Sequence, residues 1–416
     1  MNKEYPKFRE EMKDTHTILV PNMCPTHFTM IRSVFKWAGY NLEILGNRGS
    51  QVSELGLKYC HNDTCYPALL VIGQFLDALN SGEYDLQHTA LLITQTGGGC
   101  RASNYIHLIR KALEKSGYGY IPVVSLNFSG LDDGLPLNMP VILRALSSVY
   151  LGDCLDSLAN QIRPYELNKG ETDEKVNKWL NELCEMLEKG EFGNLNHVKA
   201  YFDMIAEDFS HIETVKEEKL KVGIVGEIYV KYSPLGNNDL KNFLEEQGCE
   251  VNMPGLMGFC EYCIENATVD IELYGGNRLK EKGPQFILNY FDTIERSMVK
   301  AFEKYHFHAP LPFKEMKKNN EGIISKGAKM GEGWLLPSEM VELIESGFSN
   351  IVCAQPFGCL PNHIVGKGVI NRIREIYPEA NITPIDYDPS ATRVNQENRI
   401  KLMLAIGREN LENNKK

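Results

Sequence analysis

The sequence is poor in positive charge and has no long hydrophobic run. No stretch approaches the roughly 18–20 apolar residues that a bilayer-spanning helix needs, and the opening residues, MNKEYPKFREEMKD, lack the apolar centre of a secretory signal. The 44 Lys and Arg residues are outnumbered by 55 Asp and Glu, which gives a net charge of −11. An acidic chain repels nucleic-acid phosphates unless a basic stripe offsets it, and the sequence has no such stripe. We therefore expect a cytoplasmic protein that binds neither membrane nor nucleic acid.

Several sequence motifs are missing as well. Neither a GxGxxG nor a Walker phosphate loop occurs, and the GKG at Gly366–Gly368 lacks the surrounding pattern, so we expect no ATP site in this chain. Cys260 and Cys263 form a CxxC without the second pair of a zinc ribbon, and we assign them to a helix that faces a core. The odd total of 11 cysteines, in a reducing cytosol, favours metal or redox chemistry over a disulfide framework.

The pattern of apolar runs predicts an α/β fold. With 416 residues, 43% of them hydrophobic and 24% charged, the chain has an ordinary globular composition and the length of two or three domains. Short apolar runs alternate with helical patterns of about 10–15 residues, which is typical of a parallel sheet covered on both faces. The strand-like segments are Thr15–Met23, 40–46, Ala90–Gly99, Tyr120–Phe128, Leu220–Val230, 249–255, Ser349–Phe357 and Asn381–Asp388.

The same pattern divides the chain into three parts. Residues 1–135 and 219–416 are each predicted to form a doubly wound, Rossmann-like domain with a parallel sheet. Residues 136–218 are predicted to be mainly helical, because apolar residues there recur every three or four positions. Functional sites in doubly wound sheets lie beyond the carboxyl ends of the strands. That rule makes cysteines that follow strands candidates for the site.

Three cysteines lie at predicted strand-to-helix turns or on adjoining loops: Cys65 and Cys100 in the first α/β domain, and Cys359 in the second. Thiolates are soft ligands that select iron–sulfur clusters or zinc, so the three predict a shared metal site. The alternative is that each is a small buried side chain packed in a tight turn. Glycines beside them allow main-chain N–H groups to approach a cluster or an anion closely. The predicted cofactor-binding glycines are Gly98, Gly99 and Gly358.

The motifs around these residues resemble the 2-hydroxyacyl-CoA dehydratase component family. The similar blocks lie between about Thr15 and Leu404 and read DTCYPALLVIGQFLDAL, ITQTGGGCR, GEIYVKYSPLGNN, QPFGCLPNHIVGKG and IDYDPSATRVNQENRIKLML. They are most similar to the end portion of the activase-related fusion proteins and to double-cubane cluster proteins. The resemblance implies an anaerobic, oxygen-sensitive iron–sulfur lyase or reductase with radical chemistry. It also implies that Cys65, Cys100 and Cys359 hold a [4Fe–4S] cluster, or half of an [8Fe–9S] double cubane.

The resemblance implies partners too. Members of the family receive single electrons from an activator ATPase that carries its own iron–sulfur cluster, and the dehydratases act on 2-hydroxyacyl-CoA thioesters. The fusions carry an activator and a further homologous region upstream, and this sequence has neither. We therefore expect a separate activator, and either a homologous second subunit or a homodimer. Cys24, Cys60 and Cys353 stay open as additional ligands of a double cubane.

The candidate catalytic residues are Glu227, Lys231 and His363, with Asn104 as a further candidate to bind substrate or move protons. Side chains of these types serve more often as caps, surface charges or turn residues. Family membership fixes the cofactor better than the substrate. A reductase of another small molecule, a non-catalytic electron-transfer subunit and a zinc-bound structural protein therefore stay open as alternatives.

Overall fold

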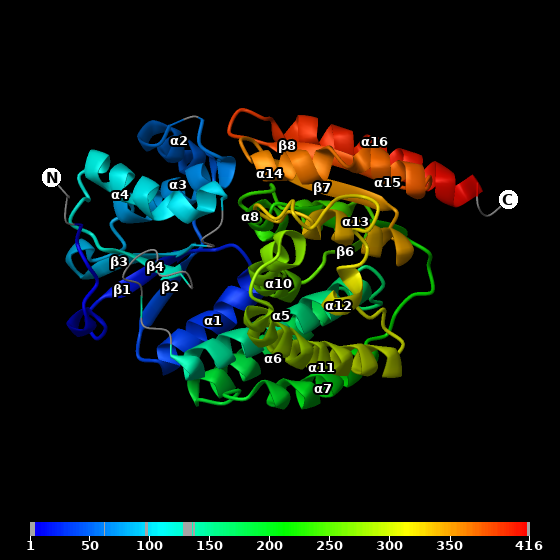
Figure 1. Ribbon diagram of the computed structural model, residues 1–416, viewed down its shortest axis with the longest axis horizontal. Coiled ribbons are helices and arrows are strands. Elements are labelled where there is room, and N and C mark those ends of the chain that lie inside the picture. The colour runs from blue at the N-terminus through cyan, green and yellow to red at the C-terminus, as the bar shows by residue number, and fades with distance from the viewer. Residues whose placement is uncertain (1–4, 62, 96–98, 128–134, 136–137, 414–416) are drawn as a thin grey trace.

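The computed structural model describes residues 5–61, 63–95, 99–127, 135 and 138–413. In that part of the chain, two parallel sheets of four strands each lie among helices, which confirms the predicted α/β class (Figure 1). Among the described helices, none combines the length and the apolar character that crossing a bilayer requires.

The first sheet consists of β1 (Thr17–Pro21), β2 (Asn41–Leu45), β3 (Thr89–Gln95) and β4 (Val123–Asn127). Its order is β2-β1-β3-β4, and every pair is parallel. Thr17 of β1 lies between Asn41 of β2 and Thr89 of β3. Because helices bury both faces of such a sheet, its central strands are nearly continuous apolar runs, which made them visible in the sequence.

The second sheet consists of β5 (Leu220–Gly226), β6 (Cys249–Asn252), β7 (Asn350–Pro356) and β8 (Asn381–Tyr387). Its order, β6-β5-β7-β8, repeats that of the first sheet. In each sheet the direction of winding reverses between two central strands, β1 and β3 in the first and β5 and β7 in the second. Ligand sites form at such reversal points, beyond the carboxyl ends of the strands. The loops that follow these four strands are therefore the places to look for a site.

Four helices accompany the first sheet: α1 (Pro25–Trp37), α2 (Ser50–Tyr59), α3 (Tyr66–Asn80) and α4 (Tyr105–Ser116). Short 3-10 turns lie at Glu10–Met12, Leu86–His88 and Arg101–Asn104. The apolar pattern predicts no helix at α2, because only Val52 and Gly56 of its 10 residues are buried. In contrast, almost the whole of α3 is buried.

The middle of the chain forms α5 (Met139–Ile162), α6 (Glu171–Glu188) and α7 (Val198–Ser210), with a 3-10 turn at Leu195–His197 and an isolated bridge between Glu166 and Thr214. A later helix, α11 (Lys282–Lys304), lies against α7. The two helices belong to one apolar core, which includes Phe202 of α7 and Phe291 and Phe302 of α11. Figure 1 shows α5, α6, α7 and α11 together along the lower edge. The packing thus crosses the predicted boundary at residue 218.

The remaining helices follow β5. They are α8 (Ile228–Tyr232), α9 (Leu240–Glu246), α10 (Met257–Tyr274), α12 (Phe313–Met316), α13 (Leu335–Glu345), α14 (Leu360–Asn362), α15 (Ile370–Ile376) and α16 (Arg393–Asn413), with a 3-10 turn at Arg278–Glu281 and a π turn at His363–Lys367. One predicted boundary is wrong: the strand-like run Leu220–Val230 ends as a strand at Gly226, and Glu227 caps α8.

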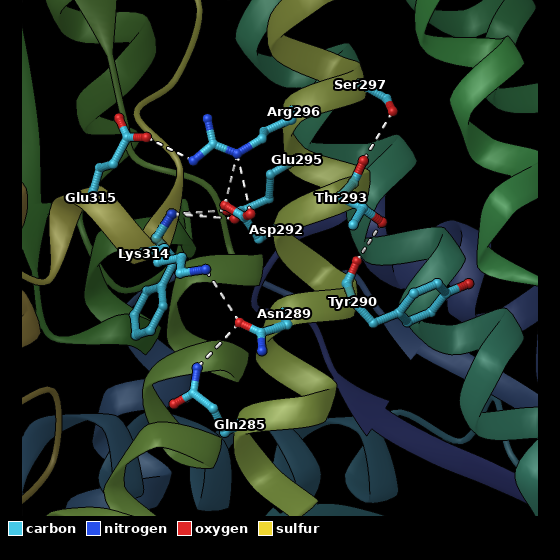
Figure 2. A network of polar contacts seen from close by, with 11 residues as sticks. Gln285, Asn289, Tyr290, Asp292, Thr293, Glu295, Arg296, Ser297, Lys314 and Glu315 are labelled. Atoms are coloured by element: carbon cyan, nitrogen blue, oxygen red, sulfur yellow. Dashed lines mark hydrogen bonds and ion pairs between the residues drawn. The ribbon is translucent and has the colours of Figure 1, made fainter. Parts of the chain in front are cut away.

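A buried pair of carboxyl groups joins α10 to α11. Glu261 is only 1% exposed, and a hydrogen bond with Glu295 favours the protonated form of Glu261. Glu295 also accepts the backbone N–H of Phe313, at 3.2 and 3.3 Å to its two oxygens (Figure 2). Burial, and then the charge of Glu295, raises the pKa of Glu261 well above its ordinary value of 4.5. Burial raises the pKa of Glu295 to about 7.

This pair predicts that the protein loses stability as the pH rises. In the folded state these carboxyls stay protonated at pH values where the unfolded chain has already released the protons, which is above about 4.5. The free energy of unfolding should therefore fall as the pH rises from about 4.5 through neutrality. The amide in Glu261→Gln does not titrate. We therefore expect this variant to reduce the fall in the free energy of unfolding between pH 5 and pH 8 by on the order of 2 kcal/mol. Urea unfolding at both pH values measures this.

Glu315→Gln is the matched control, because Glu315 lies nearby at the surface and pairs with Arg296 at 2.7 Å (Figure 2). It should leave the pH dependence unchanged. The same pH dependence in wild type and Glu261→Gln would contradict the assignment.

Candidate functional site

The three predicted metal-binding cysteines each precede a helical turn. Cys65 is the N-cap residue of α3, Cys100 precedes the 3-10 turn Arg101–Asn104 after β3, and Cys359 precedes α14 after β7. All three have extended backbone, so the chain turns into a helix directly after each of them. The backbone N–H group two or three residues further on lowers the pKa of each thiol. Each thiol therefore lies at the start of a helical turn, where backbone N–H groups favour negative charge on the sulfur.

Backbone contacts bring the three loops together. The N–H of Tyr66 donates to the carbonyl oxygen of Phe357 at 2.9 Å, which joins the start of α3 to the loop after β7 (Figure 1). Gly358 has a φ of +75°, and a Cβ there would lie 3.1 Å from the Cα of Cys65. The guanidinium of Arg101 donates to the carbonyl of Asp63, which joins the loop after β3 to the same place. The two sheets thus meet at the ends of β3 and β7.

The thiols act on one another electrostatically. Burial raises the pKa of all three, that of Cys100 to about 11. A charge on Cys65 raises the pKa of Cys100 further, and a charge on Cys100 raises that of Cys359. These effects connect Cys65 to Cys100 and Cys100 to Cys359. With their pKa values raised, the three groups are neutral thiols on their own, and a bound cation would favour their thiolate forms.

Two carboxyl groups face the same space. Glu227 accepts the N–H of Val230 at 2.9 Å, and Glu332, in the turn before α13, accepts the N–H of Ile228 at 3.0 Å. Burial, followed by the charge of Glu332, raises the pKa of Glu227 to about 8. Negative charge on Glu227 and Glu332 in turn raises the pKa of Cys359. A proton on this carboxyl pair is therefore favoured at neutral pH.

A phenol group completes the surroundings of the thiols. The hydroxyl of Tyr105, at the start of α4, lies 3.0 Å from the sulfur of Cys65. Burial, and then the charge of Cys65, raises the pKa of Tyr105 well above 10. The phenol consequently keeps its proton and can donate it in a hydrogen bond to a Cys65 thiolate.

The other two predicted catalytic residues make contacts of different kinds. Lys231 is buried on α8, and its ammonium group donates to Glu339 of α13 at 2.9 Å. His363 turns its Nδ1 to the carbonyl oxygen of Cys359 at 2.8 Å, and its Nε2 lies 3.5 Å from Asp386. Of the three candidates, Glu227 is the one whose charge raises the pKa of all three thiols.

The predicted glycines differ in what the structure says of them. Gly98 lies outside the described residues. A Cβ at Gly99 would overlap the sulfur of Met330, so the backbone before Cys100 runs against the turn that carries Glu332. Gly358 makes the close approach to Cys65 described above. Gly358 therefore permits a close contact between loops that a side chain would hinder, whereas the flexible Met330 side chain could move away from a side chain at position 99.

The additional cysteines have other neighbours. Cys24 contacts the Nδ1 of His27 at 2.9 Å, and Cys60 contacts the hydroxyl of Thr64 at 3.4 Å. Cys353 is wholly buried inside β7, where its nearest polar contact is Gln355. The CxxC pair lies on α10 as predicted, with Cys260 partly buried against a core and Cys263 exposed.

Sequence reasoning missed Glu332 and Tyr105. Glu332 lies between Gly331 and Gly333, whose backbones are both in the left-handed region. An acidic residue between two glycines, just before an apolar helix, is a sequence signal that could have identified Glu332 as a site residue. Tyr105 carries no such signal, because it reads as one more apolar residue of α4. No family model and no curated protein matches the chain.

Proposed function

We propose that this chain is the iron–sulfur component of an ATP-dependent reductive system similar to the 2-hydroxyacyl-CoA dehydratases. Cys65, Cys100 and Cys359 would hold a [4Fe–4S] cluster, and electrons would come from a separate activator ATPase. One observation carries the proposal: three cysteines from loops far apart in the sequence converge beyond the ends of β3 and β7. These are the cysteines whose motifs resemble those of the family.

The donor set suits a cluster better than a single ion. A zinc ion holds thiolates at about 2.3 Å, which places their sulfurs about 4 Å apart. Among the described residues, Cys65, Cys100 and Cys359 do not form a group whose ligand atoms all lie within 4.8 Å of one another. The three sulfurs are therefore not placed to hold one zinc ion together.

The bound cluster would supply a one-electron redox centre with one iron free of protein ligands. The chain's own residues would adjust that centre. A hydrogen bond from Tyr105 to the Cys65 sulfur withdraws negative charge from the ligand, and such bonds tune the potential of a cluster. The protonated pair of Glu227 and Glu332 would provide an acid for the hydroxyl group that leaves a 2-hydroxyacyl substrate.

The arrangement also supports a division into domains. We propose that residues 1–135 and 219–416 form two Rossmann-like domains, each with its own parallel sheet, and that residues 136–218 connect them. The repeated strand order of the two sheets supports this proposal. The site would then lie between the domains, which is a common position for ligand sites.

Anaerobic purification followed by reduction tests the function. We expect a brown protein with about four irons and four sulfides per chain, no ATPase activity of its own, and a cluster that an activator of the same family reduces only while ATP is hydrolysed. Iron analysis, electron paramagnetic resonance and turnover with acyl-CoA thioesters measure these properties.

The alternatives give different results. About eight irons per chain would indicate a complete double cubane, and reduction without acyl-CoA turnover would indicate an electron-transfer subunit or another substrate. Stoichiometric zinc without sulfide would overturn the proposal, as would ATP hydrolysis by the chain alone.

A further inference from the structure

A second cluster of ligand side chains lies at the reversal point of the first sheet, just after β1. Cys24 precedes α1, and its sulfur lies 2.9 Å from Nδ1 of His27. A carboxylate oxygen of Asp156, on α5, lies 3.7 Å from the same nitrogen. The three ligand atoms all lie within 4.8 Å of one another. Cys24 and His27 are 3% and 1% exposed, so the cluster is built into the interior.

The surroundings prepare His27 to bind a cation through Nδ1. Its Nε2 lies 2.8 Å from Asp153, whose two oxygens also accept the backbone N–H groups of Leu256 and Met257 at 2.7 and 2.9 Å. These bonds hold Asp153 as an acceptor behind Nε2, and Nδ1 faces Cys24 and Asp156 on the other side of the ring. A carboxylate behind the other nitrogen is the usual partner of a metal-binding histidine.

Helix geometry explains why these side chains meet. Cys24 and His27 are three residues apart at the start of α1, and Asp153 and Asp156 have the same spacing on α5. Residues three apart share one face of a helix, so the two faces oppose each other where α1 packs on α5. Thr26 donates to the second oxygen of Asp156 at 2.8 Å and fixes that carboxylate.

A cavity of about 80 Å³ adjoins the cluster. His27, Asp153 and Asp156 line it, together with Ser157 and Tyr232. That volume accommodates a few water molecules, and the walls offer them polar partners. A cation held from one side by three ligands would therefore keep a coordination position open to the cavity.

A cysteine–histidine–aspartate row is also the arrangement of thiol nucleophiles. Here Cys24 does not line the cavity and is almost completely buried, so its sulfur is not presented to a substrate in the cavity. His27 and Asp156 do line it. The Cys24 sulfur thus lies on the far side of His27 and Asp156 from the cavity. This position suits a metal ligand, because a ligand has to contact only the ion and not a substrate.

We propose that Cys24, His27 and Asp156 bind a divalent cation of the zinc class, with Asp153 as the positioning residue behind His27 and the fourth position open to the cavity. Sulfur, nitrogen and carboxylate oxygen are the three ligand types of zinc, and three protein ligands with an open position are typical of catalytic zinc. The site is independent of the function proposed for the other three cysteines.

Zinc analysis of the full chain tests the site. To remove the other thiols, Cys65, Cys100 and Cys359 are all replaced by alanine, and the protein is stripped with a chelator and dialysed against Zn²⁺. We expect about one zinc per chain, and loss of that zinc in Cys24→Ser and in Asp156→Ala. Asp153→Asn should weaken zinc binding about 10–100-fold while leaving the stoichiometry at saturation. Ser157→Ala, on the same cavity wall, is the matched control and should bind normally.

Substitution with Co²⁺ gives a second readout, since a thiolate-to-cobalt absorption should appear and should vanish in Cys24→Ser. Asp156 has a side chain 32% exposed, so Asp156→Ala is tolerable even where Cys24→Ser does not fold. No zinc in the background protein, or zinc retained in both Cys24→Ser and Asp156→Ala, would overturn the proposal. Selective alkylation of Cys24 by iodoacetamide, in protein that binds no zinc, would also overturn the proposal. It would show that Cys24 is a reactive nucleophile and not a metal ligand.

Discussion

Replacing any one of Cys65, Cys100 and Cys359 by alanine is expected to reduce the iron content from about four atoms per chain to nearly none. With two thiolates left, the proposed cluster would have two corners without a protein ligand and would be lost more easily. Iron and sulfide analysis of anaerobically purified variants measures the effect, and the native paramagnetic signal should disappear with the iron.

Cysteines outside the site provide the controls. Cys184 is partly buried on α6, and Cys263 is exposed on α10. Cys184→Ala and Cys263→Ala should keep nearly all of the iron, because they remove at most a small packing contact. Equal loss in all five variants would mean that the substitutions damage the fold and that ligation has been misassigned.

The second large effect is expected at the ion pair of Lys231 and Glu339. Both side chains are about 95% buried, and Nζ lies 2.9 Å from the carboxylate oxygen. Lys231→Met leaves the carboxylate of Glu339 unpaired in the interior, next to the buried acids Glu332 and Glu342. Removing one partner of a buried pair costs about 3–5 kcal/mol, so the free energy of unfolding should fall by that amount.

The double variant Lys231→Met/Glu339→Gln separates charge from packing. It removes both charges and should recover most of the lost stability, since replacing a buried pair as a whole is often nearly neutral. Lys36→Met is the matched control, because Lys36 pairs with Glu188 at 2.7 Å at the surface, where such pairs contribute little. A Lys231→Met protein of normal stability that has lost only its activity would show instead that Lys231 is catalytic.

Much of the fold could be predicted because burial leaves a periodic signal. The strand β3 contains the continuous apolar run Ala90–Ile93, and the buried apolar residues of α4 recur every three or four positions on one face of the helix. The signal fails where burial is slight or uniform. The polar helix α2 was missed for the first reason. The end of β5 was misplaced for the second, because the apolar run continues through Gly226 into buried α8.

The sequence by itself determined that the chain is α/β and that Cys65, Cys100 and Cys359 stand at the starts of helical turns. These are local properties, set by apolar periodicity and by the residues around each turn. Only the tertiary structure decided which loops meet. Tyr105 lies against Cys65 from 40 residues away, and Asp153 lies against His27 from 126 residues away. Such contacts follow from the order of the strands and from the packing of one helix on another. The forces that select them act between distant segments, whereas the apolar periodicity of the sequence describes each segment separately.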